Sequence, residues 1–329
     1  SHKSYKFCHY DNFSLFEKVS LVKNYTKPVT RYLFIKMSKV VDLEKEFSPS
    51  VWSKRFNETQ ILEHHKKVVR DGTKLARELL KCELDVPYGS GERSKMDIYG
   101  TDLPSDAPIF VLIHGGYWQI EEYTKVEGTY GTLPLVRAGC RVIAVDYEMC
   151  PNVTLSELVE LSHKFISFIL NYAAKLGAPS VSFLGHSAGA HLLATQFQEA
   201  HFSQLPHRAL IKDVYLLSGL YDLRELRHTN AANKGNLLSI TDANVAALSP
   251  GLDTFEHLTN IPINFILALG DDESLTFRKT SEDMRDALLK GTHRVKYHLL
   301  PNRDHFDLVE QLNEQDAELT KILLENLVK

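Results

Sequence analysis

Phe183-Leu184-Gly185-His186-Ser187-Ala188-Gly189-Ala190-His191 is the stretch that decides the fold of this chain. Its centre is a G-x-S-x-G motif, which is typical of a sharp strand-to-helix turn that presents a serine as a nucleophile. The residues before the motif form a short apolar run that predicts a strand, and those after it predict a helix. The motif alone also occurs by chance, so its context decides the interpretation. We expect Ser187 to stand on a strained turn at the edge of a sheet.

Strand-like and helix-like segments alternate along most of the chain. Runs typical of strands lie at 83–88, 95–99, 108–113, 141–147, 180–184, 211–219, 263–270 and 295–300, and helical stretches lie at 57–82, 122–138, 155–176, 190–197, 277–290 and 306–328. This alternation predicts an α/β fold with a mostly parallel central sheet and helices on both faces. It weakens between residues 221 and 255, where we expect an insertion over the active site.

Composition narrows the class of partner. The chain has 329 residues, is 43% hydrophobic and carries a net charge of -4, so nothing favours nucleic acid or an anionic membrane over a small-molecule substrate. The four cysteines (Cys8, Cys82, Cys140 and Cys150) show no C-x-x-C spacing, and neither a metal site nor a cofactor is expected. The absence of a long apolar run predicts a soluble cytoplasmic protein. The oligomeric state is open, and a homodimer is one alternative.

A serine nucleophile needs a general base and a third group that orients the base. In folds with this elbow the acid and the histidine follow later strands, in that order. Asp271-Asp272-Glu273 comes after the strand that ends at Gly270, and His305 comes after the strand that ends at Leu300. We therefore predict His305 as the base and Asp272 as the acid, with Asp271 and Glu273 left open as alternatives.

The stretch His114-Gly115-Gly116-Tyr117-Trp118 follows the apolar strand 108–113. Glycines allow backbone N–H groups to turn toward a carbonyl oxygen, as stabilisation of an oxyanion requires. We predict an oxyanion hole made by the N–H groups of Gly116, Tyr117 and Ala188, with His114 bracing the loop. Tyr117 and Trp118 have two interpretations, as a wall that binds a planar substrate or as core aromatics, and we predict the substrate-binding role.

Taken together, these residues resemble the α/β-hydrolase superfamily, and within it the group related to hormone-sensitive lipase. That group usually carries His-Gly-Gly-Gly, whereas this chain has His-Gly-Gly-Tyr-Trp at 114–118. This variant, with the elbow and Asp304-His305-Phe306, is similar to the kynurenine formamidase family. So are the stretches 44–55, 86–89 and 96–99, and the resemblance covers roughly residues 43–329.

The resemblance implies one α/β-hydrolase domain at 43–329, with lid contributions from 43–82 and 221–255. Residues 1–42 are an N-terminal extension to which no role is assigned. The implied activity is hydrolysis of N-formyl-L-kynurenine to L-kynurenine and formate, with a formyl-enzyme formed by the predicted triad of Ser187, Asp272 and His305. A generalist carboxylesterase with the same triad and a non-catalytic binding module are the alternatives.

Overall fold

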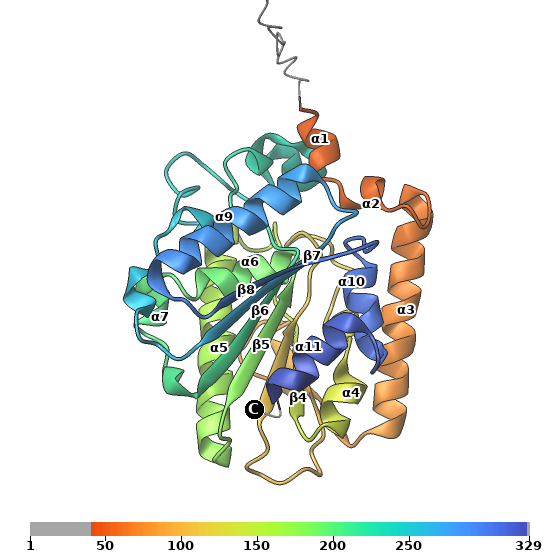
Figure 1. The fold of residues 1–329 in the computed structure, drawn as a ribbon, viewed down its shortest axis with the longest axis vertical. Coiled ribbons are helices and arrows are strands. Elements are labelled where there is room, and N and C mark those ends of the chain that lie inside the picture. The colour runs from red at the N-terminus through yellow and green to blue at the C-terminus, as the bar shows by residue number, and fades with distance from the viewer. Residues whose placement is uncertain (1–40, 328–329) are drawn as a thin grey trace, which may run out of the picture. The chain divides into compact units, whose positions relative to one another are not determined.

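An eight-stranded sheet forms the centre of the computed structural model, which describes residues 41–327 (Figure 1). The strand order is β1-β2-β4-β3-β5-β6-β7-β8. The strands are β1 (Cys82–Pro87), β2 (Lys95–Tyr99), β3 (Ile109–Ile113), β4 (Arg141–Val145), β5 (Val181–His186), β6 (Ile211–Leu217), β7 (Asn264–Gly270) and β8 (Val295–Leu300). Only the β1–β2 and β2–β4 pairs are antiparallel. The predicted α/β fold with a mostly parallel sheet is confirmed.

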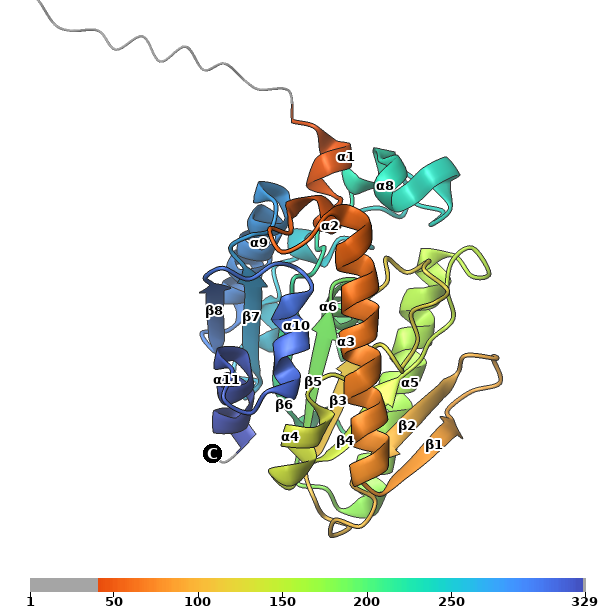
Figure 2. The same ribbon diagram turned by 90° about the vertical axis from the view of Figure 1, so that its right-hand side faces the viewer.

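Helices cover both faces of this sheet (Figure 2). Helices α5 (Leu155–Leu176), α6 (Ala188–Thr195) and α9 (Leu275–Gly291) pack against one face. Helices α3 (Glu58–Leu79), α4 (Thr132–Arg137), α10 (Asp307–Glu310) and α11 (Glu318–Leu327) pack against the other. Strands β3, β4 and β5 are buried along their whole length, because a parallel strand between two helical layers has no solvent-facing side.

The ends and the buried faces of the two longest helices can be explained from their sequences. In α5, Thr154 and Glu157 form a reciprocal capping box at the first turn, and Gly177 ends the helix in the left-handed conformation. In α3, the side chain of Asn57 accepts a hydrogen bond from the N–H of Gln60 at 3.0 Å. The inward residues of α3 recur at intervals of three or four, which places them on one face of the helix.

Two predicted helices differ from the structure. The stretch 122–138 is helical only at Thr132–Arg137, because Gly131 takes a positive φ of 74° and begins a new turn there. The stretch 306–328 divides into α10, a 3₁₀ turn at Gln311–Asn313 and α11. At this division the side chain of Asn313 accepts a hydrogen bond from the N–H of Gly131 at 3.0 Å, which joins the two irregular segments.

Segments from distant parts of the chain lie over the carboxyl ends of the parallel strands (Figure 1). One is residues 43–57, here called the strap, which contains α1 (Leu43–Glu46) and α2 (Pro49–Trp52). The other belongs to the predicted insertion, where α8 (Asn230–Asn233) lies among short 3₁₀ turns. The carboxylate of Glu44 joins them, since it accepts hydrogen bonds from the backbone N–H groups of Asn230 and Ala231 at 2.7 and 2.8 Å.

The predicted extension at 1–42 falls almost wholly outside the described residues. Within residues 41–327, no helix combines the length and the apolar character that crossing a membrane requires. α7 (Glu199–Phe202) completes the set of α-helices in this part of the chain.

Candidate active site

The G-x-S-x-G motif forms the predicted turn between β5 and α6. Ser187 stands at its apex with φ 54° and ψ -119°, a conformation that a non-glycine residue adopts only when the surrounding structure holds it. Its N–H donates to the carbonyl oxygen of Leu217 at 2.9 Å. A Cβ on Gly185 would lie 2.5 Å from the carbonyl oxygen of Gly189, and one on Gly189 would clash with the carbonyl of Ile113. Both glycines are therefore required by close backbone packing.

Ser187 and His305 line one chamber of about 240 Å³. Its walls come from the strap, from α3, from the loop after β3 and from the loop after β8. The lining residues are Phe47, Ser48, Pro49, Ser50, Leu62, His65, Gly115, Gly116, Tyr117, Ile120, Tyr123, His186, Ser187, Ala231, His305 and Phe306. Most of these side chains are apolar or aromatic, so the chamber favours a ligand with an aromatic ring.

Glu273, rather than Asp272, is the carboxylate beside His305. Its Oε2 lies 2.8 Å from Nδ1 of His305, and both side chains are buried. Its Oε1 accepts hydrogen bonds from the hydroxyl of Ser218 and, at 3.2 Å, from the N–H of Gly270. Each carboxylate oxygen therefore has a partner, and the side chain is fixed in one orientation.

The prediction that Asp272 is the carboxylate beside His305 is wrong, because the Asp272 side chain is engaged elsewhere. Its carboxylate forms an ion pair with Lys54, whose side chain is largely exposed. Its N–H donates to the carbonyl of Arg303 at 3.0 Å, whereas the N–H of Glu273 turns back to Gly270. Asp271 is also turned away, because its carboxylate accepts from the N–H of Asn302 at 2.6 Å. The turn after β7 thus directs only the third of the three acidic side chains to His305.

Aromatic side chains enclose the imidazole of His305. Its centroid lies 5.1 Å from the ring of Phe277, 5.4 Å from that of Phe306 and 4.7 Å from that of His186. Burial holds the pKa of His186 well below its ordinary value, so this ring is neutral. Its Nε2–H donates to the carbonyl oxygen of His305 at 2.9 Å. His186 therefore supports the loop that carries His305.

The loop after β3 has the backbone that an oxyanion site requires. Gly116, Tyr117 and Trp118 all have positive φ, at 105°, 51° and 60°. Within residues 41–327, the N–H groups of Gly116 and Tyr117 have no backbone acceptor. The N–H of Ala188 is the first in α6 and has no acceptor within the helix. His114 is buried, stacks on Tyr147 at 4.2 Å and braces this loop, as expected.

The two aromatic residues of this loop have different roles. Tyr117 lines the chamber, and its hydroxyl donates to the carbonyl oxygen of Phe47 in the strap at 2.5 Å. Trp118 is fully buried and is absent from the chamber wall, so its predicted contact with substrate is wrong and the core interpretation holds. Its Nε1–H donates to Nδ1 of His191 at 3.2 Å. Burial lowers the pKa of His191 to about 4, which keeps that acceptor nitrogen unprotonated.

The strap contributes residues that the sequence did not indicate. Arg55 pairs with Asp304 at 2.8 Å and with Glu310 at 2.8 Å. The hydroxyl of Ser53 donates to the same carboxylate of Asp304 at 2.6 Å. Burial alone would raise the pKa of Asp304, but these hydrogen bonds hold it below its ordinary value. Together with the Lys54–Asp272 ion pair, these contacts attach the strap to two residues. They are Asp272, which immediately precedes Glu273, and Asp304, which immediately precedes His305.

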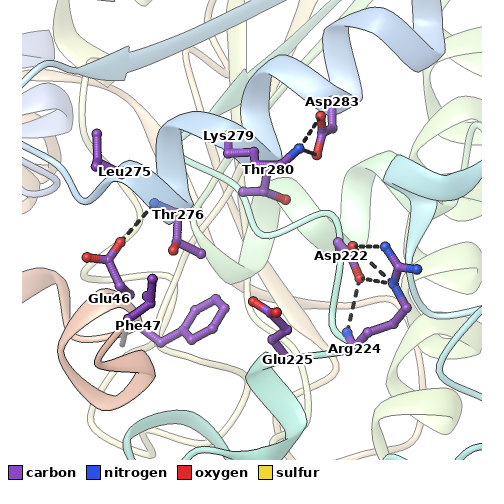
Figure 3. A pocket seen from close by; sticks show the side chains of 11 residues that line it. Glu46, Phe47, Asp222, Arg224, Glu225, Leu275, Thr276, Lys279, Thr280 and Asp283 are labelled. Carbon is purple, nitrogen blue, oxygen red and sulfur yellow. Dashed lines mark hydrogen bonds and ion pairs between the residues drawn. The ribbon is translucent and has the colours of Figure 1, made fainter. Parts of the chain in front are cut away.

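Phe47 also lines a larger cavity, of about 590 Å³ (Figure 3). Four of its charged side chains form ion pairs with one another, Asp222 with Arg224 and Lys279 with Asp283, both at 2.7 Å. Glu46 accepts from the N–H of Thr276 at 2.9 Å and so joins the strap to α9. Neither Ser187 nor His305 lines this cavity. The smaller chamber is the candidate active site.

Comparison with known proteins gives the family of the chain. The family model described as alpha/beta hydrolase fold matches residues 110–306. Kynurenine formamidase of Salmo salar is 35% identical over 293 residues, which cover 88% of this chain and 96% of the relative. The chain belongs to the kynurenine formamidase family. Kynurenine formamidase of Drosophila melanogaster is 31% identical over 290 residues, which cover 86% of this chain and 96% of that protein.

Solved structures show the same fold at lower identity. Esterase LipW from Mycobacterium marinum superimposes with a TM-score of 0.60 at 20% identity, over 82% of this chain and 86% of that one. Membership of the kynurenine formamidase family confirms the resemblance drawn from the loop after β3 and from the stretch at 44–55. The chain is accordingly a serine hydrolase with the α/β-hydrolase fold.

Proposed function

We propose that this protein hydrolyses N-formyl-L-kynurenine to L-kynurenine and formate with a triad of Ser187, His305 and Glu273. The observation that carries the proposal is the hydrogen bond of 2.8 Å between Glu273 Oε2 and His305 Nδ1, in a chamber that Ser187 also lines. A carboxylate on Nδ1 fixes the imidazole tautomer and leaves Nε2 free to accept the serine proton. Family membership supports the choice of substrate.

The reaction follows in two halves. His305 Nε2 takes the proton of Ser187 as Oγ attacks the formyl carbon, and the N–H groups of Gly116, Tyr117 and Ala188 stabilise the oxyanion. The carbon–nitrogen bond then breaks as His305 returns the proton to the departing aryl amine. Water, activated by the same imidazole, attacks the formyl-enzyme and releases formate. Glu273 stabilises the imidazolium in both halves and orients it.

The shape of the chamber supports an aromatic leaving group. A formyl group is the smallest acyl group, so most binding energy must come from the rest of the substrate. At about 240 Å³, the chamber lies below the range of about 300–1,000 Å³ usual for drug-sized ligands, which suits one aromatic ring. Tyr117, Tyr123 and Phe306 supply aromatic surface for it. We also propose that the strap, α3 and the insertion act as the lid, since residues from each line the chamber.

The test compares kcat/KM for N-formyl-L-kynurenine with that for a short aryl ester, with one enzyme preparation. We expect the formamide to be preferred by orders of magnitude. A preference for the ester would replace this proposal with a generalist carboxylesterase that uses the same triad. Ser187→Ala should lower kcat by several orders of magnitude while the melting temperature stays near that of the wild type. Inactivity of the folded wild type toward every acyl substrate would instead favour a binding module.

A further inference from the structure

The chamber wall has no charged side chain with which to hold a charged substrate. Within residues 41–327, its lining contains no lysine, arginine, aspartate or glutamate. N-formyl-L-kynurenine, however, carries an α-carboxylate and an α-ammonium group at the end remote from its formamide. Bringing a carboxylate to an apolar wall without a partner costs free energy, because the charge loses hydration. A cation at the rim of the chamber would remove this cost.

Most cations near the chamber already have carboxylate partners. The pairs are Arg55 with Asp304 and Glu310, Lys54 with Asp272, Arg70 with Glu127, and Arg93 with Asp146. Diverting one of them to a substrate would leave a carboxylate unpaired, and for Asp304, Glu127 or Asp146 that carboxylate is buried. These side chains are therefore poor candidates for recognising the substrate carboxylate.

Lys66 differs from these four cations. It lies one helical turn after Leu62 in α3, so the two side chains project from the same face of the helix. Leu62 lines the chamber. The Nζ of Lys66 lies 5.9 Å from the ring centroid of Tyr123, a second residue of the chamber wall. In the part of the chain that the structure describes, no carboxylate oxygen comes within 4.0 Å of this nitrogen.

We propose that Lys66 binds the α-carboxylate of the substrate and so determines the preference for formylated amino acids over aryl formamides that lack the carboxylate. This inference rests on the proposed function. The flexible four-carbon stem of lysine allows Nζ to move from the face of Tyr123 to a carboxylate at the rim. Because a lysine over an aromatic face is attracted by about 0.5–1 kcal/mol at an exposed site, Tyr123 holds the ammonium near the chamber without neutralising it.

Two substrates that differ only in the carboxylate test the proposal. N-formyl-L-kynurenine carries it, and N′-formylkynuramine has hydrogen in its place. In Lys66→Gln we expect kcat/KM for N-formyl-L-kynurenine to fall about 2- to 5-fold, the range of an exposed ion pair, and the fall to lie in KM. N′-formylkynuramine should be hydrolysed as by the wild type. Added salt should reduce the wild-type preference for the carboxylate substrate, because it screens the pair.

The matched control is Lys67→Gln, which removes the same charge from the next residue of α3. Lys67 is exposed and pairs with Asp71, so we expect neither substrate to be affected. An equal loss for both substrates in Lys66→Gln, or no loss for either, overturns the role of Lys66 while the proposed function stands. If the folded wild type hydrolyses neither formamide, the proposed function fails and this inference fails with it.

Discussion

Replacement of Glu273 by glutamine tests the assignment of the acid most directly. The change keeps the size of the side chain and removes its charge beside His305, with Nδ1 and Oε2 now 2.8 Å apart. With charge centres about 4 Å apart and an effective dielectric constant of about 20, a carboxylate stabilises an imidazolium by about 4 kcal/mol. That free energy corresponds to a factor of about 10³ in rate. An amide N–H directed at Nδ1 also favours the wrong tautomer, so we expect kcat to fall about 10³- to 10⁴-fold.

The neighbouring acidic residue provides the control. Asp272 pairs with the exposed Lys54, and an exposed ion pair contributes about 0–1 kcal/mol. Asp272→Asn should therefore leave kcat for N-formyl-L-kynurenine within about fivefold of the wild-type value. Glu273→Asp should be intermediate, because a carboxylate shorter by one methylene cannot span the same gap.

The assay is steady-state kinetics with N-formyl-L-kynurenine, together with thermal unfolding to verify that each variant is folded. We expect KM to change little in Glu273→Gln, since the acid acts on the transition state rather than on bound substrate. If Asp272→Asn lost more than a hundredfold in kcat while Glu273→Gln kept more than a tenth, the assignment drawn from the geometry would be refuted.

Two further changes probe the support of the site. Ser218→Ala removes the hydroxyl donor to Oε1 of Glu273, so kcat should fall about tenfold at unchanged KM, and an unchanged kcat would exclude Ser218 from positioning the acid. Burial lowers the pKa of His191 to about 4 in the folded protein, against about 6.5 in the unfolded chain. Between pH 6.5 and pH 4 the unfolded state therefore binds the proton more readily than the folded state, so the free energy of unfolding falls as the pH falls through this range. Urea titrations should show that, from pH 7 to pH 5, the free energy of unfolding of His191→Gln falls by about 2 kcal/mol less than that of the wild type. Equal falls for the two proteins would contradict the argument.

Most of the sheet could be predicted because parallel strands buried on both faces leave continuous apolar runs in the sequence. The strand at Ile109–Ile113 and the helix at Leu155–Leu176 lie where the pattern places them. Helix limits were less predictable where tertiary contacts decide them. Gly131 and Asn313, far apart in the sequence, meet at the points where two predicted helices were too long.

The direction of a side chain on a tight turn could not be derived from the sequence. Asp271, Asp272 and Glu273 are chemically equivalent as candidates, and only the hydrogen bonds of the turn after β7 direct the third toward His305. Trp118 is a second case. Gly116, Tyr117 and Trp118 all have positive φ, and in this loop Trp118 lies in the core whereas Tyr117 lines the chamber. Residue type and order predicted the chemistry, but not which neighbour performs it.

The strap shows why a local motif is not sufficient to form this site. The elbow needs only residues that are close in the sequence, whereas Ser53 and the carboxylate of Asp304 are 251 residues apart. Because Asp304 precedes His305 and Asp272 precedes Glu273, the contacts from Ser53 and Lys54 lie next to both the proposed base and the proposed acid. The same segment supplies Phe47 to the chamber wall. Docking of the strap therefore supplies part of the chamber wall and also holds the residues that precede Glu273 and His305.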